Sequence, residues 1–278
     1  MSGIPATKLA DFFAAIAPLL EGRETHAEAA ARLYGSVAVD LNSNNSQKRE
    51  TSRDAARLAL YGRFCRIHRL DALGSTFAET RTAIVKGEAH SADAAPSGEQ
   101  AWEQLVADYF FAHPMHHAEL NENGSELPAF LRAKADARAL PHWIAELADL
   151  EWWSFRTRVA PDDPQDAYPA RGTLRLAGTV ELRPYAHDLC VWLEAEPAAG
   201  ESRESEPEAR ACVVIFWRDL DLDTRFAEAT PLELLILQAV HQGHPLAEAA
   251  ARAGASADEL AETLADLRAA GILLGGES

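Results

Sequence analysis

Histidines, one carboxylate and three cysteines are the residues of this chain whose types could do chemistry. The run His113-Pro114-Met115-His116-His117 gathers three imidazoles, and imidazole is a common zinc ligand. A zinc site needs three or four ligands in fixed geometry, whereas Pro114 breaks the helix here and no matched second pair of ligands follows. The run therefore favours a turn with partly exposed histidines, and we expect no metal site in this chain.

Glu151 lies within the apolar stripe of a helix predicted over Pro141–Val159. A carboxylate buried there must be paired or protonated, so it is either a general base or, as we favour, the partner of an arginine on the helix predicted over Arg53–Leu70. A free-standing enzyme would need distant groups to converge, namely His68, His113, His187, Glu151 and Cys190. The chain has no nucleophile elbow, phosphate-binding glycine loop or zinc motif. We therefore assign no catalytic residue and expect no catalysis by this chain alone.

The three cysteines, Cys65, Cys190 and Cys212, each sit within an apolar pattern and lack metal-site spacing. They favour reduced thiols in a core, which suits the cytoplasm best. We see no signal-peptide pattern at the N-terminus. No apolar run approaches the roughly 20 residues needed to span a bilayer, so we expect no membrane partner.

The charge is strongly negative and uneven. The net charge is −17 over 278 residues. Residues 1–85 carry eleven Lys/Arg against nine Asp/Glu, whereas residues 194–278 carry six Arg against seventeen Asp/Glu. This balance opposes non-specific binding to nucleic acid or anionic membrane, and it gives the two ends of the chain different surfaces.

Apolar periodicity predicts only helices before residue 160. A capping box of Thr25 and Glu28 starts the second of them. Asn42–Ser52 has no periodicity and indicates an exposed loop. The helices are predicted over Ala6–Leu20, from Thr25 through Tyr34, Arg53–Leu70 continuing through Lys86, Trp102–Ala112, Leu127–Ala135 and Pro141–Val159. The segment Ala160–Ala170, with three prolines and three aspartates, indicates a domain boundary.

The pattern changes after this boundary. Three strands are predicted over Thr173–Arg183, Asp188–Glu194 and Ala211–Trp217, and three helices over Pro231–Gln242, Pro245–Ala253 and Ala257–Ala270. We therefore predict an α+β protein, with an all-helical domain over residues 1–160 and a small winged-helix-like module of three antiparallel strands and three helices over residues 171–278.

Three segments of the helical half carry a family resemblance. They are Tyr61 with the arginine-rich helix around it, His113–Leu131, and Pro141–Trp153 with its Leu-Ala-x-Leu-Glu-Trp core. They resemble the partner subunits called HvfC, BufC, MbnC and TglI, which accompany multinuclear non-haem iron enzymes that oxidise cysteines in ribosomally made peptides. The long loops at Asn42–Ser52 and Pro197–Pro207 depart from this family, so the subfamily and the peptide substrate stay open.

The resemblance implies a division of labour. The iron would belong to a separate barrel-type oxidase subunit, and this chain, without a cofactor of its own, would form a heterodimer with it and present the peptide. The C-terminal module would bind the leader of the precursor peptide as an added strand. The arginine-rich helix would dock the oxidase, since interfaces favour Arg and aromatics. The candidate docking residues are Arg57, Tyr61, Arg63, Arg66 and Arg69.

The predicted peptide groove has two walls. One is the third strand, expected to lie exposed at an edge, with Cys212, Val214 and Phe216 on one face and Val213, Ile215 and Trp217 on the other. The opposite wall is the last helix. The candidate peptide-binding residues are Val213, Val214, Ile215, Phe216, Trp217, Leu260, Thr263, Leu264 and Leu267. On this hypothesis Ile215→Asp or Leu264→Asp weakens peptide binding while docking survives.

The alternative is a winged-helix transcription regulator that binds DNA through the helix over Ala257–Ala270. A DNA-reading helix needs Arg, Lys, Asn or Gln at base edges and cations at phosphates. This helix offers Asp258, Glu259, Glu262 and Asp266 against Arg268. We therefore prefer the peptide-binding hypothesis and expect no nucleic-acid partner.

Overall fold

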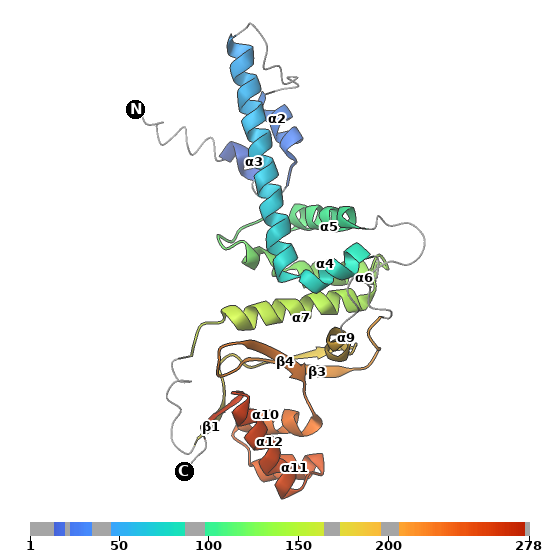
Figure 1. Cartoon of the computed structure of the whole chain (residues 1–278), viewed down its shortest axis with the longest axis vertical. Helices are drawn as coiled ribbons and strands as arrows, with labels where there is room; N and C mark the ends of the chain where they lie inside the picture. Colours follow the sequence, from blue (N-terminus) through green and yellow to red (C-terminus); the bar gives the residue numbers. More distant parts are fainter. Residues whose placement is uncertain are drawn as a thin grey trace. The chain divides into compact units, whose positions relative to one another are not determined.

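The chain forms a mixed α/β structure of two compact units, Met1–Pro141 and His142–Ser278. The computed structural model (Figure 1) describes residues 14–19, 23–34, 46–86, 98–163, 173–195 and 206–275. The sequence predicted the boundary after residue 160. The division instead falls before the helix His142–Val159, so that this helix belongs to the second unit.

Every regular element described in the first unit is helical. The elements are α2 (His26–Tyr34), α3 (Ser46–Thr76), α4 (Ala78–Lys86), α5 (Glu99–Ala112), the 3-10 helix η1 (Asn121–Gly124) and α6 (Leu127–Asp136). Large apolar side chains at the helical spacing fill its core, among them Phe77, Trp102, Tyr109 and Leu131, all at most 1% exposed. Most of the helix predicted over Ala6–Leu20 and of the loop predicted over Gly87–Gly98 lies outside the described residues.

The loop predicted over Asn42–Ser52 is wrong from Ser46 onward, because α3 already begins there. This first stretch of α3 includes Gln47, Lys48, Arg49 and Glu50. These are good helix formers that carry no apolar periodicity, so the pattern of apolar residues gave no signal.

The second unit pairs helices with two small antiparallel sheets. Its elements are α7 (His142–Val159), β1 (Leu174–Leu176), β2 (Glu181–Tyr185), α9 (Leu189–Glu194), β3 (Cys212–Arg218), β4 (Thr224–Glu228), α10 (Pro231–Gln242), α11 (Leu246–Ala253), α12 (Ala257–Ala269) and β5 (Leu273–Gly275). One sheet has the order β2-β3-β4 and the other joins β1 to β5.

Helix α7 covers one face of the three-stranded sheet, as Figure 1 shows. The hydroxyl of Tyr185 donates to Asp149 Oδ2 at 3.0 Å, and Arg183 from the same strand donates to Asp149 at 3.4–3.5 Å. Glu146, one turn earlier, accepts hydrogen bonds from the backbone of Ala186 and His187. These polar contacts attach α7 to the sheet and explain why it belongs to the second unit.

A second apolar cluster lies on the opposite face of the sheet. Its buried members come from the sheet, from the helices that follow and from the last strand: Ile215, Ala229, Ile236, Leu237, Leu267, Ile272 and Leu273. The three C-terminal helices confirm the sequence prediction almost residue for residue. Capping boxes of Thr230 with Glu233 and Ser256 with Glu259 start α10 and α12, and left-handed Gly243 and Gly254 end α10 and α11.

Two of the three predicted strands need correction. Asp188–Glu194 is not a strand: the Asp188 side chain accepts a hydrogen bond from Val191 N at 3.2 Å and caps the short helix α9. A short apolar run fits either structure, and the cap decides for a helix. Thr173–Arg183 is two strands, β1 and β2, separated by a turn in which Val180 N donates to Ala177 O. The third predicted strand, Ala211–Trp217, is confirmed as β3.

Candidate functional site

The predicted peptide-binding strand is the centre of its sheet. Strand β3 pairs with β2 through Val214↔Arg183 and with β4 through Val214↔Glu228. Its backbone groups are therefore used on both sides, and the prediction that this strand lies exposed at an edge is wrong. The predicted alternation does hold, since Val214 and Phe216 align with Arg183 and Glu181 on the face toward α7, and Ile215 belongs to the opposite cluster.

The predicted groove between β3 and α12 is a packed core. Ile215 is 2% exposed and Leu267 is 2% exposed, and Leu260, Leu264 and Trp217 pack against the same cluster. Val214 and Phe216 are fully buried, and Val213 is half-buried. The Thr263 hydroxyl donates to Glu259 O at 2.8 Å within its own helix. The structure thus brings the two walls together, but without a space between them for a peptide.

The sheet has an open edge at β4. Ala229 N donates to Val213 O at 2.8 Å, and this pair lies in the β3–β4 register. Because hydrogen-bonded pairs alternate along an antiparallel ladder, Arg225 and Ala227 direct their backbone groups toward β3. The N–H and C=O groups of Thr224, Phe226 and Glu228 therefore point outward, and no other described strand pairs with them.

The other edge, at β2, is blocked. By the same alternation, Leu182 and Pro184 direct their backbone outward, while Glu181, Arg183 and Tyr185 bond to β3. Proline has no N–H to donate, and its presence on an edge strand hinders pairing with a further strand. A strand added to this sheet would therefore find a complete set of outward donors and acceptors only along β4.

A rigid hairpin tip adjoins the start of this edge. Asp219 Oδ1 accepts from the backbone N–H groups of Asp221 and Asp223 at 3.0 and 2.9 Å, and Asp219 Oδ2 accepts from Arg225 Nε at 2.8 Å. The tip presents Leu220 and Leu222 to solvent, and Leu222 has a left-handed backbone with φ of 68°. The hydrogen bond from Arg225 lowers the pKa of the Asp219 carboxyl.

At the far end of β4, an ion pair holds the strand in place. Arg210 donates to both carboxylate oxygens of Glu228 at 2.6 and 2.5 Å and also pairs with Asp188. The hydrogen bonds from Arg210 lower the pKa of Glu228. Between the two ends, Phe226 lies 5.9 Å from Phe216, ring centre to ring centre. The open edge is thus fixed at its start, middle and end.

Strand β4 was not among the strands predicted from the sequence. The sequence signal for this strand was the alternation in Thr-Arg-Phe-Ala-Glu, directly after the turn-forming residues Asp219–Asp223.

Two atoms of this hairpin, Thr224 Oγ1 and Arg218 Nε, are buried without a hydrogen-bond partner among the described residues. Both atoms lie where the ladder of β3 and β4 begins.

The outer face of α12 is acidic, which weighs against DNA. Asp258, Glu259, Glu262 and Asp266 are exposed, whereas Arg268 is half-buried. Glu259 also serves its own helix, since hydrogen bonds from Ser256 lower the pKa of its carboxyl. A helix with this face would repel phosphates.

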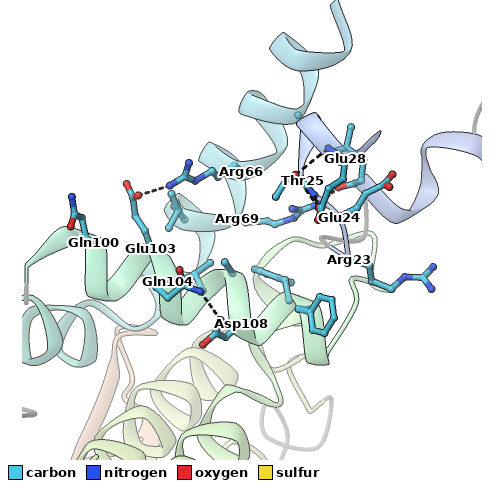
Figure 2. A pocket seen from close by; sticks show the side chains of 17 residues that line it. Arg23, Glu24, Thr25, Glu28, Arg66, Arg69, Gln100, Glu103, Gln104 and Asp108 are labelled. Carbon is cyan, nitrogen blue, oxygen red and sulfur yellow. Dashed lines mark hydrogen bonds and ion pairs between the residues drawn. The ribbon is translucent and has the colours of Figure 1, made fainter. Parts of the chain in front are cut away.

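The predicted docking arginines on α3 divide into two groups. Arg57, Tyr61 and Arg63 are exposed. Arg66, which is also exposed, and Arg69, which is half-buried, line a cavity of about 750 Å³ between α3, α5 and residues 19 and 23–28, shown in Figure 2. Arg66 pairs there with Glu103 across to α5. The docking prediction therefore combined side chains from two different sides of the helix.

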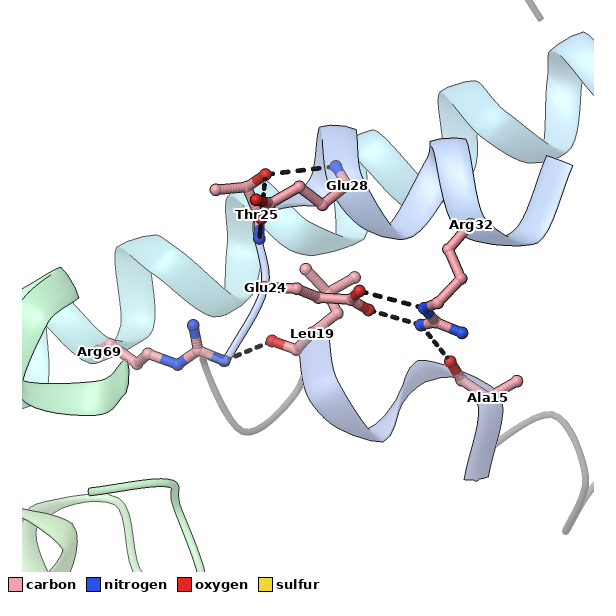
Figure 3. A network of polar contacts seen from close by, with 7 residues as sticks. All are labelled: Ala15, Leu19, Glu24, Thr25, Glu28, Arg32 and Arg69. Carbon is pink, nitrogen blue, oxygen red and sulfur yellow. Dashed lines mark hydrogen bonds and ion pairs between the residues drawn. The ribbon is translucent and has the colours of Figure 1, made fainter. Parts of the chain in front are cut away.

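Arg69 serves the packing of the first unit. Its guanidinium donates to Leu19 O at 2.6 Å, as Figure 3 shows, and lies 5.5 Å from the centre of the Phe110 ring. Burial lowers the pKa of this arginine. The same figure shows the predicted capping box, which is confirmed: Thr25 N donates to Glu28 Oε2 at 2.7 Å and Glu28 N donates to Thr25 Oγ1 at 3.3 Å.

The histidine run forms a turn organised by Asn123. The buried Asn123 side chain accepts from the backbone N–H groups of His116 and His117 and donates to His117 O. His113 stacks on Tyr109 with ring centres 5.1 Å apart. Within the described ranges, no three His, Cys, Asp or Glu residues are grouped as a metal site requires.

On α7, Asp149 is the buried carboxylate, whereas Glu151, which the sequence placed in the apolar stripe, is half-buried.

The cysteines are free, and those of the second unit are buried. Burial raises the pKa of the Cys190 thiol to about 12, and burial also raises the pKa of Cys212. The thiolate is the reactive form of cysteine, and a raised pKa lowers the fraction of thiolate at neutral pH. Both thiols are therefore poor nucleophiles at neutral pH.

We therefore expect iodoacetamide at pH 8 to leave Cys190 and Cys212 unmodified in the folded chain. Mass spectrometry after proteolysis measures the extent at each cysteine. The control is the same reaction in guanidinium chloride, where both residues become accessible. Labelling of the folded chain as fast as that of the unfolded chain would contradict this assignment.

No described helix combines the length and the apolar character required to cross a bilayer. No protein-family model matches the chain, and no curated protein is similar enough to count as a relative.

Proposed function

We propose that this chain is a non-catalytic partner subunit that binds a ribosomally made precursor peptide by strand addition. It would present the peptide to a separate, multinuclear non-haem iron oxidase that modifies its cysteines. The observation that carries the peptide-binding part is the open edge of β4, with outward backbone groups at Thr224, Phe226 and Glu228. The choice of an iron oxidase as the partner rests on the family resemblance of the sequence.

The edge suits an extended peptide for three reasons. Main-chain bonding to an edge strand gives affinity without a deep pocket. Pro184 directs such addition to β4 alone. The ion pair of Arg210 with Glu228 and the Asp219 turn hold the strand before the peptide arrives, which reduces the entropy lost on binding.

The surroundings support a winged-helix-like module. Helices α10, α11 and α12 contact one another, and β1, the first strand of the unit, forms a small antiparallel pair with β5, which follows α12. In a DNA-binding winged helix the outer face of the recognition helix would carry cations. The acidic face of α12 favours the peptide over DNA.

The proposal is tested by isolating the tagged full-length chain from its own cells at moderate salt. Mass spectrometry identifies what accompanies it, and elemental analysis measures iron in the eluate. We expect a separate iron-containing protein and a short cysteine-containing peptide. A chain that elutes alone would contradict the proposal, and one that elutes with DNA would favour the winged-helix regulator.

A further inference from the structure

The side chains of β4 differ between the two faces of the sheet, and a peptide paired with its open edge would meet both faces. Phe226 belongs to the face toward α7, because it pairs with Phe216 of β3. Its neighbours Arg225 and Ala227 belong to the opposite face. Successive residues of an added strand alternate between the same two faces. The register therefore decides which peptide residue meets which side chain of β4.

On the face toward α7, a row of aromatic side chains ends at the open edge. Phe216 is fully buried, whereas Phe226 beside it is half-buried. Their ring centres are 5.9 Å apart. An added strand would place one side chain directly opposite Phe226, at what is termed the central position of the peptide. Aromatic and β-branched side chains stabilise such cross-strand pairs, so a large apolar residue fits this position best.

The carboxylates beside the edge differ in their freedom to meet a peptide. Both carboxylate oxygens of Glu228 accept hydrogen bonds from Arg210. Asp219 holds the hairpin turn, and its side chain is 19% exposed. The side chain of Asp223 is 69% exposed, and its contact with Arg225 is 3.3 Å long, whereas Arg225 Nε bonds Asp219 at 2.8 Å. Asp223 is therefore the carboxylate best placed to select the charge of a peptide residue.

Asp223 lies in line with β4, directly before its first residue. Its carbonyl oxygen accepts from Asp219 N at 2.9 Å, so its backbone points toward β3 and its side chain shares the face of Arg225 and Ala227. Antiparallel pairing is the more stable arrangement per residue. In that arrangement the peptide residue three positions after the central one lies opposite Asp223. Opposite charges directly across a ladder attract and like charges repel, so Lys or Arg fits there.

We propose that the open edge of β4 selects an extended peptide segment in which a large apolar residue is followed, three positions later, by Lys or Arg. The inference rests on the proposed function for the use of this edge by a peptide, and it adds the composition and direction of the segment. Phe226 contacts the apolar residue, and Asp223 contacts the cation. The segment runs antiparallel to β4, main-chain bonds supply affinity, and these two side chains fix the register.

The test selects peptides on the immobilised full-length chain. The probe is a displayed library of random twelve-residue peptides. We expect wild type to enrich Lys or Arg three positions after a large apolar residue, and Asp223→Lys to enrich Asp or Glu there instead. The matched control is Asp221→Lys, which makes the same change of charge at an exposed residue of the turn. This control is expected to keep the preference of wild type.

A synthetic copy of the most enriched wild-type peptide measures the size of the effect by fluorescence anisotropy. Exchange of its cationic residue for Glu is expected to weaken binding to wild type about fivefold. The same exchange is expected to strengthen binding to Asp223→Lys by a similar factor, and to weaken binding to Asp221→Lys as it does for wild type. Circular dichroism and melting temperature verify that each variant is folded.

The outcomes separate this inference from the proposed function. Phe226→Pro, which removes an outward N–H, reports whether a selected peptide uses the edge. Peptides that depend on the edge but bind Asp223→Lys as tightly as wild type would overturn the inference and leave peptide binding at β4 standing. A cation preferred three positions before the apolar residue, or an equal change of preference in Asp221→Lys, would overturn it as well. If no enriched peptide is sensitive to Phe226→Pro, peptide binding at this edge fails too.

Discussion

Replacing Phe226 by proline is expected to reduce peptide binding about tenfold or more while the sheet stays folded. The N–H of Phe226 points away from β3, so its loss removes no bond of the β3–β4 ladder. It does remove the central donor of the open edge, worth about 0.5–1.5 kcal/mol, and the ring blocks close approach of an added strand. The measurement is the affinity of the immobilised chain for a synthetic copy of the peptide that co-purifies from cells.

Two controls isolate the backbone from the side chain. Phe226→Ala keeps the N–H and loses the aromatic contact with Phe216. Leu182→Pro removes an outward donor from β2, the edge that Pro184 already blocks. Both are expected to bind the peptide within about threefold of wild type, a loss no larger than one weak contact. Equal loss in Phe226→Pro and Leu182→Pro would mean that β4 is not the binding edge.

Ile215→Asp is expected to unfold the second unit rather than to impair binding selectively. The side chain is 2% exposed and lies in the cluster that joins the sheet to α10 and α12. A carboxylate there has no partner and loses its hydration, so we expect a loss of more than about 4 kcal/mol of unfolding free energy. Denaturation by urea, followed by circular dichroism, measures it. This expected outcome replaces the one drawn from the sequence, in which Ile215→Asp leaves a folded protein with weakened peptide binding.

Leu182→Asp is the matched control for this substitution. Leu182 is the direct partner of Ile215 across the β2–β3 ladder, but it is 36% exposed. The same charge at this position is expected to cost about 1 kcal/mol or less. If both variants unfolded at the same urea concentration, the cluster around Ile215 would not be the core of the unit.

The three helices that follow β4 agree closely with their predicted ranges, and signals at their ends that the prediction did not use account for their bounds. Thr230 and Ser256 open α10 and α12 with a glutamate three residues later, and Gly243 and Gly254 close α10 and α11. Each of these signals involves residues within one helical turn of one another, so it can be recognised from the sequence alone. The apolar run after Asp188 is too short for its spacing to distinguish a helix from a strand. The hydrogen bond from Val191 N to the Asp188 side chain, which caps the helix, became evident only in the structure.

The position of the candidate site could not be predicted from the spacing of residues along the chain. Which strand of a sheet lies at the centre is decided by non-local pairing. Here β3 pairs with residues about thirty positions before it and about ten after it. The choice between Asp149 and Glu151 as the buried carboxylate likewise depended on where β2 places Tyr185 and Arg183. The strand β3 and the helix α12 were predicted correctly from the sequence, but β3 lies at the centre of its sheet and not at an exposed edge.

Pro184 also limits what copies of this chain can do to one another. A sheet with two open edges can add strands from further copies without end, which is the route to fibrils. With β2 closed by proline, the three-stranded sheet offers only β4. Two copies that pair through β4 would each use their single open edge, so growth through this sheet stops at two. The proline that would direct a peptide to β4 therefore also limits association of copies through this sheet to pairs, even at high protein concentration.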